Sequence, residues 1–174
     1  MLMNATRTAL VCLALTACQD EPAPATGPTP PPVQQGVAAY VTVDNLTAQP
    51  GQTVRVRVQV QVGTQQDFKL GSYTGRLRFD PAKIEFKQEN TINDGLRVAN
   101  PLGAAQGEIR FAGASATGFT QLVLYDASFQ VKTAGYVQSL QLTMEELSAA
   151  LSLQNLQAQV RVNPQVFLSR QPNR

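Results

Sequence analysis

The chain has 174 residues, with 14 lysines and arginines against 12 aspartates and glutamates, and it contains no histidine and no tryptophan. Its net charge of +2 gives no basis for binding nucleic acid or an anionic membrane surface, because both need a marked basic excess. The length suits one ordinary domain with a sizeable core.

The first 17 residues have the organisation of a secretory signal. Arg7 precedes a short apolar run, which is too short to span a bilayer because a span takes about 20 apolar residues. The run ends at residues 15–18 (Leu-Thr-Ala-Cys), which resemble the lipobox of bacterial lipoproteins. The resemblance implies that residues 1–17 are removed and that Cys18 carries the lipid. The alternative is an ordinary signal peptide in which this cysteine occurs by chance.

The residue after Cys18 bears on location. It is Gln19, whereas in Gram-negative lipoproteins an aspartate at that place can retain the protein at the inner membrane. The resemblance therefore implies a lipid-anchored protein of the bacterial cell envelope, at the outer membrane.

A proline-rich segment follows over residues 18–36, with six prolines between positions 19 and 35. Such a segment cannot bury enough apolar surface to fold, and it favours extended polyproline II. Stretched at about 3.1 Å per residue, it would reach about 50 Å. We expect a linker that holds a folded domain away from the membrane.

From residue 37 apolar and polar residues alternate, which is typical of strands with one buried face. The clearest run is Thr53–Val62, where five valines alternate with arginine and glutamine. Turn signals at Pro50-Gly51 and Asp80-Pro81 separate such runs. Further strands are expected at Tyr40–Val43, Tyr73–Phe79, Lys83–Lys87, Glu108–Ala112, Leu122–Lys132, Val137–Thr143 and Gln159–Val162. Many short strands predict an all-β sandwich, with Val54, Val56, Val58, Leu77, Phe79, Phe111, Phe129 and Val131 in its core.

One stretch favours helix locally. After Thr143, the residues Leu147, Ala150 and Leu151 stand at helical spacing. The sequence leaves a short helical turn and the end of a strand equally open here.

Several runs carry a resemblance to a known family. Residues 48–56 (AQPGQTVRV) and 75–86 (GRLRFDPAKIEF) are followed by 107–111 (GEIRF), 127–131 (ASFQV) and 158–162 (AQVRV). In sequence and order they resemble a cohesin domain over residues 37–168, which leaves 169–174 as a C-terminal tail. The resemblance implies a two-sheet jelly-roll sandwich of about nine strands, akin to some carbohydrate-binding modules.

Cellulosomal cohesins bind the dockerin modules of enzymes through one sheet face. The family carries an outward Asn-x-Asp pair on the strand before the Asp-Pro turn, and here Ser72 and Thr74 stand at those positions, so the carboxylate is missing. Because Leu77 and Phe79 are expected to point inward, the alternate residues of the strand point outward. The residues that the resemblance implies for partner binding are Ser72, Thr74, Arg76, Arg78, Glu108, Arg110 and Gln141, with Ser139 on the same face.

The residues give little basis for catalysis or metal binding. Acid–base and nucleophilic catalysis are most often built on histidine or a thiol, and the carboxylates are scattered about one per strand or turn. We therefore expect no enzyme and no cofactor. A structural Ca²⁺ would need clustered oxygen ligands, for which Asp67 and Asp126 are the pair that the fold could bring together.

Other surface candidates are weaker. Sugars stack on exposed aromatic rings, and the candidates are Tyr40 on an outward position and Phe119 and Tyr136 near loop ends. Leu122 and Leu124 are expected to point outward, and exposed apolar pairs can mark a contact surface. The cohesin topology would place Arg55 and Arg57 on one sheet and Arg76 and Arg78 on the other, so they would not form one basic patch.

The favoured interpretation is a non-enzymatic, membrane-anchored binding or scaffolding module that presents a sheet face to a protein partner. One alternative is a cell-surface module that binds a polysaccharide. The other is a structural component of an envelope or secretion assembly. No nucleic-acid partner is expected.

Overall fold

The computed structural model describes residues 27–33, 35–64 and 67–169. The expected signal sequence and the lipidation residue Cys18 lie outside the described residues. Within the described residues, no helix is long and apolar enough to cross a membrane.

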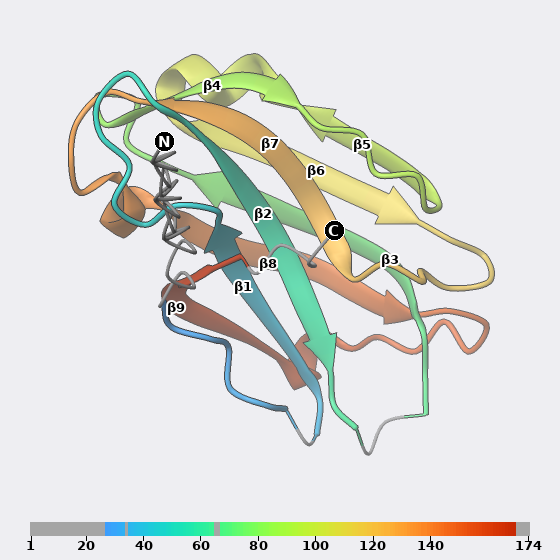
Figure 1. The fold of residues 1–174 in the computed structure, drawn as a ribbon. Helices are drawn as coiled ribbons and strands as arrows, with labels where there is room; N and C mark the ends of the chain where they lie inside the picture. Colours follow the sequence, from blue (N-terminus) through green and yellow to red (C-terminus); the bar gives the residue numbers. More distant parts are fainter. Residues whose placement is uncertain (1–26, 34, 65–66, 170–174) are drawn as a thin grey trace, which may run out of the picture.

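Two sheets pack face to face (Figure 1). The strands are β1 (Val37–Val43), β2 (Thr53–Val62), β3 (Leu70–Arg78), β4 (Ile84–Glu89), β5 (Leu96–Asn100), β6 (Glu108–Ala114), β7 (Val123–Val131), β8 (Gln141–Ala149) and β9 (Val160–Leu168). Three 3-10 turns accompany them, η1 (Pro101–Gln106), η2 (Tyr136–Ser139) and η3 (Gln157–Gln159). The five-stranded sheet has the order β4-β7-β2-β1-β9 and the four-stranded sheet has the order β5-β6-β3-β8. The expected all-β sandwich of nine strands is therefore confirmed.

The core lies between the two sheets and is built from the alternating apolar residues. All eight residues predicted for it are buried, with exposed fractions between 0% and 6%. Aromatic rings join the layers: Phe79 meets Phe129 edge to face at 5.2 Å, and Phe111 stacks on Tyr125 at 5.4 Å. Offset and edge-to-face ring pairs add to the free energy gained from burial alone.

The stretch after Thr143, where the sequence left a helical turn and a strand end equally open, forms a strand as far as Ala149. β8 covers Gln141–Ala149, where Met144 and Leu147 face the core. Of the strand expected at Val137–Thr143, the first three residues lie in η2 and the last three in β8. Pairing with β3 along the whole strand outweighs the local helical spacing, since tertiary context routinely overrides propensity. The sequence also failed to indicate β5, which pairs with β6.

A β-bulge in β7 overturns one expectation. Val58 pairs with Tyr125 and the next residue, Gln59, pairs with Val123, so Leu124 is the extra residue of β7. A bulge shifts the alternation of side chains by one position. Leu124 is therefore 2% exposed, and Leu122 is partly buried against the core. The predicted outward apolar pair does not exist.

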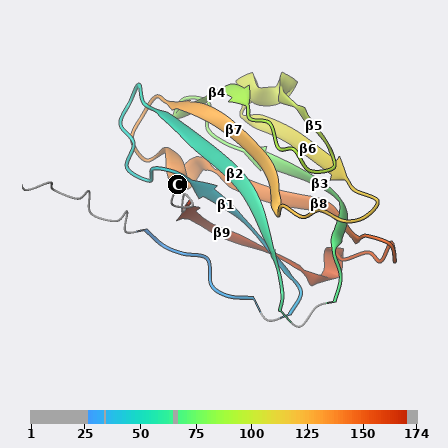
Figure 2. The same cartoon turned by 45° about the vertical axis from the view of Figure 1, so that its right-hand side comes forward.

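The described end of the proline-rich segment lies beside β9 (Figure 2). Pro28 accepts a hydrogen bond from the amide of Leu168, and Val33 accepts one from the amide of Thr64, both at 3.3 Å. A hollow of about 690 Å³ lies between Pro31–Val33 and the β9 residues 161–164. Pro164 and a bulge interrupt the pairing of β9 with β1, as is common for edge strands.

Candidate functional site

The outward surface of the four-stranded sheet, here called the four-stranded face, carries the residues expected to bind a partner. Along β3, Tyr73, Gly75 and Leu77 are buried, whereas the residues between them are half-buried and Arg78 is exposed. The expected alternation is thus correct. In the sheet register, Arg76 lies between Arg110 of β6 and Thr143 of β8.

One half of this face is a cluster of charges. Glu108 pairs with Arg76 at 3.5 Å, with Arg78 at 3.0 Å and with Arg110 at 3.1 Å, and Arg76 also pairs with Glu145. Hydrogen bonds from Arg110 and Arg78 hold the pKa of Glu108 below its usual value. The side chains of Arg78 and Arg110 are 54% and 58% exposed, so both remain open to an incoming carboxylate.

The other half of the face is apolar. Leu96 and Val98 of β5 are 69% and 57% exposed, and they pair with Ala114 and Ala112 of β6. Beyond the alanines lie Ser72 and Thr74. The small side chains leave a shallow hollow of about 210 Å³ between the two β5 residues and Glu146 of β8.

Gln141 and Ser139 differ in placement. Gln141 is exposed on β8 and pairs with Arg78, so it belongs to the four-stranded face as expected. Ser139 belongs to η2, and its hydroxyl donates to the carbonyl of Tyr136 at 2.6 Å. The expectation that Ser139 shares the face is wrong, because the chain forms a 3-10 turn there and reaches the sheet only at Gln141.

Sequence reasoning missed the apolar half of the face and two of its acids. The run Leu96–Asn100 lies between Gly95 and Pro101 and alternates, which is a strand signal that could have been used. Glu145 and Glu146 were hidden by a bulge in β8, since Thr74 pairs with Glu146 and the next residue, Gly75, pairs with Met144.

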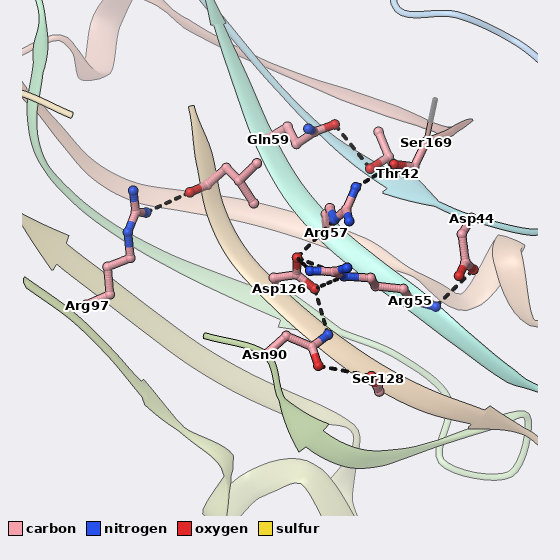
Figure 3. A network of polar contacts seen from close by, with 11 residues as sticks. Thr42, Asp44, Arg55, Arg57, Gln59, Asn90, Arg97, Asp126, Ser128 and Ser169 are labelled. Carbon is pink, nitrogen blue, oxygen red and sulfur yellow. Dashed lines mark hydrogen bonds and ion pairs between the residues drawn. The ribbon is translucent and has the colours of Figure 1, made fainter. Parts of the chain in front are cut away.

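The outward surface of the five-stranded sheet carries a different polar cluster (Figure 3). Asp126 of β7 is 3% exposed and accepts hydrogen bonds from Arg55, Arg57 and Asn90 at 2.7–3.0 Å. The hydrogen bond to Asp126 raises the pKa of Arg55. Arg55 and Arg57 therefore lie on the sheet opposite Arg76 and Arg78, as expected.

This cluster bears on the calcium expectation. The carboxylate of Asp126 is already occupied by two guanidinium groups and an amide, and Asp67 is exposed in a loop. Across the described ranges, no three histidine, cysteine, aspartate or glutamate side chains gather in a way that could hold a metal ion. Asp126 functions here as a partner of arginine.

The structure also locates the aromatic candidates for sugar binding. Phe119 is buried under the guanidinium of Arg97, 4.4 Å from its ring centre. Tyr136 is 1% exposed and donates to the carbonyl of Asn45. Tyr40 is half-buried with its ring edge-to-face against Phe167 at 5.6 Å. Phe119 and Tyr136 are thus core residues rather than exposed platforms.

No protein-family model and no curated protein sequence matches this chain. Several solved structures match it. The sixth cohesin of scaffoldin B from Acetivibrio cellulolyticus, solved with a Cel5 dockerin, has a TM-score of 0.55 at 13% identity and covers 77% of this chain and 99% of its own. The OlpC cohesin of Clostridium thermocellum, solved with a dockerin, has a TM-score of 0.55 at 12% identity, covering 80% and 96%. A non-cellulosomal cohesin from Archaeoglobus fulgidus has a TM-score of 0.51 at 17% identity, covering 78% and 88%.

At these identities the likeness concerns the fold. Residues of this chain form a cohesin-like β-sandwich of two sheets. The resemblance stated from the sequence is confirmed at that level.

Proposed function

We propose that this protein is a non-enzymatic binding or scaffolding module whose four-stranded face captures a protein partner. One observation carries the proposal: exposed Leu96 and Val98 lie beside a cluster of arginines and glutamates on one rigid sheet surface. Stable protein interfaces combine apolar and polar contacts, and arginine is enriched among the residues that dominate binding energy.

The chemistry of the face defines the partner. An apolar side chain would fill the shallow hollow between β5 and β8, and carboxylates would pair with Arg78 and Arg110. The solved cohesins with bound dockerins support a protein partner for this fold. Ser72 and Thr74 stand where cellulosomal cohesins carry the Asn-x-Asp pair, so we do not expect the partner to be an ordinary cellulosomal dockerin.

The proposal includes a membrane anchor. Cys18 follows Leu-Thr-Ala, and we propose that it becomes the acylated first residue of the mature chain. Stable anchoring needs two lipid signals, which a multiply acylated cysteine supplies. Mass spectrometry of the mature N-terminus should find a lipid on Cys18, and Cys18→Ser should release or mislocalise the protein. An unmodified N-terminus beyond residue 18 would contradict the anchor.

The binding face is tested by paired variants. The purified protein is immobilised, partners are captured from detergent-solubilised membranes, and each captured protein is quantified by mass spectrometry. Arg78→Ala with Arg110→Ala should weaken capture about tenfold, and so should Val98→Asp, with little change in melting temperature.

Matched controls lie on β9 of the other sheet, where Arg161 and Val162 are exposed. Arg161→Ala and Val162→Asp should leave capture unchanged. If capture of a partner is unchanged by the variants of the four-stranded face but is lost with the β9 variants, this assignment is contradicted.

A further inference from the structure

The sandwich is open on the side where β4 and β5 lie. In the described part of the chain each of these strands pairs with a single neighbour, β4 with β7 and β5 with β6. Both views place them on the same side of the molecule (Figures 1 and 2). A pocket of about 420 Å³ lies there, here called the β4–β5 gap. Leu96 and Val98 line both the gap and the hollow of the four-stranded face, so the two meet across β5.

The carboxylate side chain of Glu89, the last residue of β4, lines this gap. Phe86 pairs with Phe129, and a bulge before Gln88 leaves Glu89 paired with Ala127. Ala127 faces the core, so the bulge places Glu89 on the side of β4 that borders the gap, where it remains exposed at the end of the strand. Partial burial raises the pKa of Glu89, and among the described residues its carboxylate has no ion pair and no hydrogen bond.

A buried hydroxyl lines the same gap. Tyr125 is 1% exposed, and its hydroxyl has no hydrogen-bond partner among the described residues. By contrast, the hydroxyl of Tyr73 donates to the carbonyl of Leu124 at 2.6 Å. Burial first, and then the nearby carboxylates of Glu89 and Asp126, raise the pKa of Tyr125. Buried polar groups are nearly always paired, so this hydroxyl indicates a missing partner.

Arg97, a cationic side chain that lines the gap, already has hydrogen-bond partners elsewhere. The guanidinium of Arg97 donates to the carbonyls of Asp94, Val123 and Gln121 and to the hydroxyl of Tyr73, and it pairs with the carboxylate of Asp94. Its five N–H donors are therefore occupied. Arg97 therefore has no donor left for the Glu89 carboxylate or the Tyr125 hydroxyl, and another group can bind them.

We propose that the β4–β5 gap binds an alkylammonium group, supplied by a lysine side chain of the protein bound on the four-stranded face. The ammonium donates to the Glu89 carboxylate and to the Tyr125 oxygen, and its methylene stem packs on Leu96 and Val98. A compact ammonium with three donors suits one carboxylate and one hydroxyl, whereas a guanidinium needs a wider set of acceptors. A hard metal ion would need several more oxygen ligands. The partner's role here rests on the proposed function.

The test needs no partner protein. The isotopically labelled full chain is titrated with n-butylammonium chloride, and amide NMR shifts are followed at constant ionic strength. We expect saturable shifts at Glu89, Leu96, Val98 and Tyr125, and weaker, unsaturated shifts with n-butanol, which has the same shape without the charge. Glu89→Gln should weaken butylammonium binding about tenfold, and Tyr125→Phe should weaken it several-fold.

Glu85→Gln is the matched control, because Glu85 lies on the same strand and is already paired with Lys87 and Lys132. It should leave the titration unchanged. Equal shifts with butanol and butylammonium, or butylammonium binding that survives Glu89→Gln, would overturn the proposal and leave a gap that holds water only. That failure would not touch the four-stranded face, because the Arg78→Ala and Arg110→Ala arm of its test changes residues outside the gap, whereas Val98 lines both sites.

Discussion

Replacing Asp126 by asparagine tests whether the polar cluster on the five-stranded sheet stabilises the domain. Asp126 is 3% exposed and accepts hydrogen bonds from Arg55, Arg57 and Asn90. Asparagine keeps the shape of the side chain, but it removes the charge and turns an amide N–H₂ toward these donors. The two arginines then lose their shared counter-ion.

The magnitude follows from the exposure of each partner. Removing one partner of a buried ion pair costs about 3–5 kcal/mol. The side chain of Arg55 is 42% exposed and regains water, which reduces its share. That of Arg57 is 17% exposed and keeps a bond to the Ser169 hydroxyl. We expect the free energy of unfolding to fall by about 3 kcal/mol, which lowers the melting temperature by about 6–12 °C.

Urea unfolding followed by far-ultraviolet circular dichroism measures this loss as a lower midpoint at unchanged slope. Glu108→Gln is the comparison, because Glu108 also contacts three arginines but its side chain is 26% exposed, against 4% for Asp126. Its effect should be far smaller, since water replaces exposed contacts. Equally small losses of unfolding free energy in the Asp126→Asn and Glu108→Gln variants would refute the reasoning from burial.

Three further predictions concern the core. Phe79→Ala should cost about 3–5 kcal/mol in urea unfolding, because Phe79 is 6% exposed against Phe129; a mild loss would remove Phe79 from the core. Gly113→Ala should cost about 1–3 kcal/mol by overpacking, since its new Cβ would lie 2.5 Å from the Tyr73 ring, whereas Ala112→Ser, on the half-exposed neighbour, should be neutral. Burial raises the pKa of every tyrosine, that of Tyr136 to about 12. The folded protein thus keeps phenolic protons that the unfolded chain releases near pH 10. This stability is complete below pH 10 and is lost above it, and early tyrosinate absorbance in the folded protein would contradict it.

Alternation was enough to predict most of the fold. Valines at every second position of Thr53–Val62 indicated β2 and its buried face, and the same parity placed Leu77 and Phe79 in the core. The sequence did not indicate β5 because this strand turns Arg97 and the small Ala99 inward and exposes Leu96 and Val98. Its apolar pattern is inverted relative to a simple core strand.

The candidate site was predicted less completely, and bulges are the physical reason. One extra residue in β7 buries Leu124, another in β8 accompanies Glu145, and another in β4 places exposed Glu89 beside the gap. A bulge is set by the pairing of two strands, so a single run of residues does not reveal it. The residues of β3, which has no bulge against β6, were placed correctly.

The parallel pairing of β1 with β9 has a consequence for how the chain folds. Val37 pairs with Val160 and Val43 pairs with Leu168, so the two ends of the sandwich sequence meet in one sheet. Contacts of such long range make folding slow, because the loop-closure entropy is lost before the contact is gained. A chain that emerges N-terminus first therefore leaves the β1 edge of the five-stranded sheet unpaired until Leu168 has followed. During that interval β1 is an open strand edge, the feature through which unfinished β-proteins aggregate.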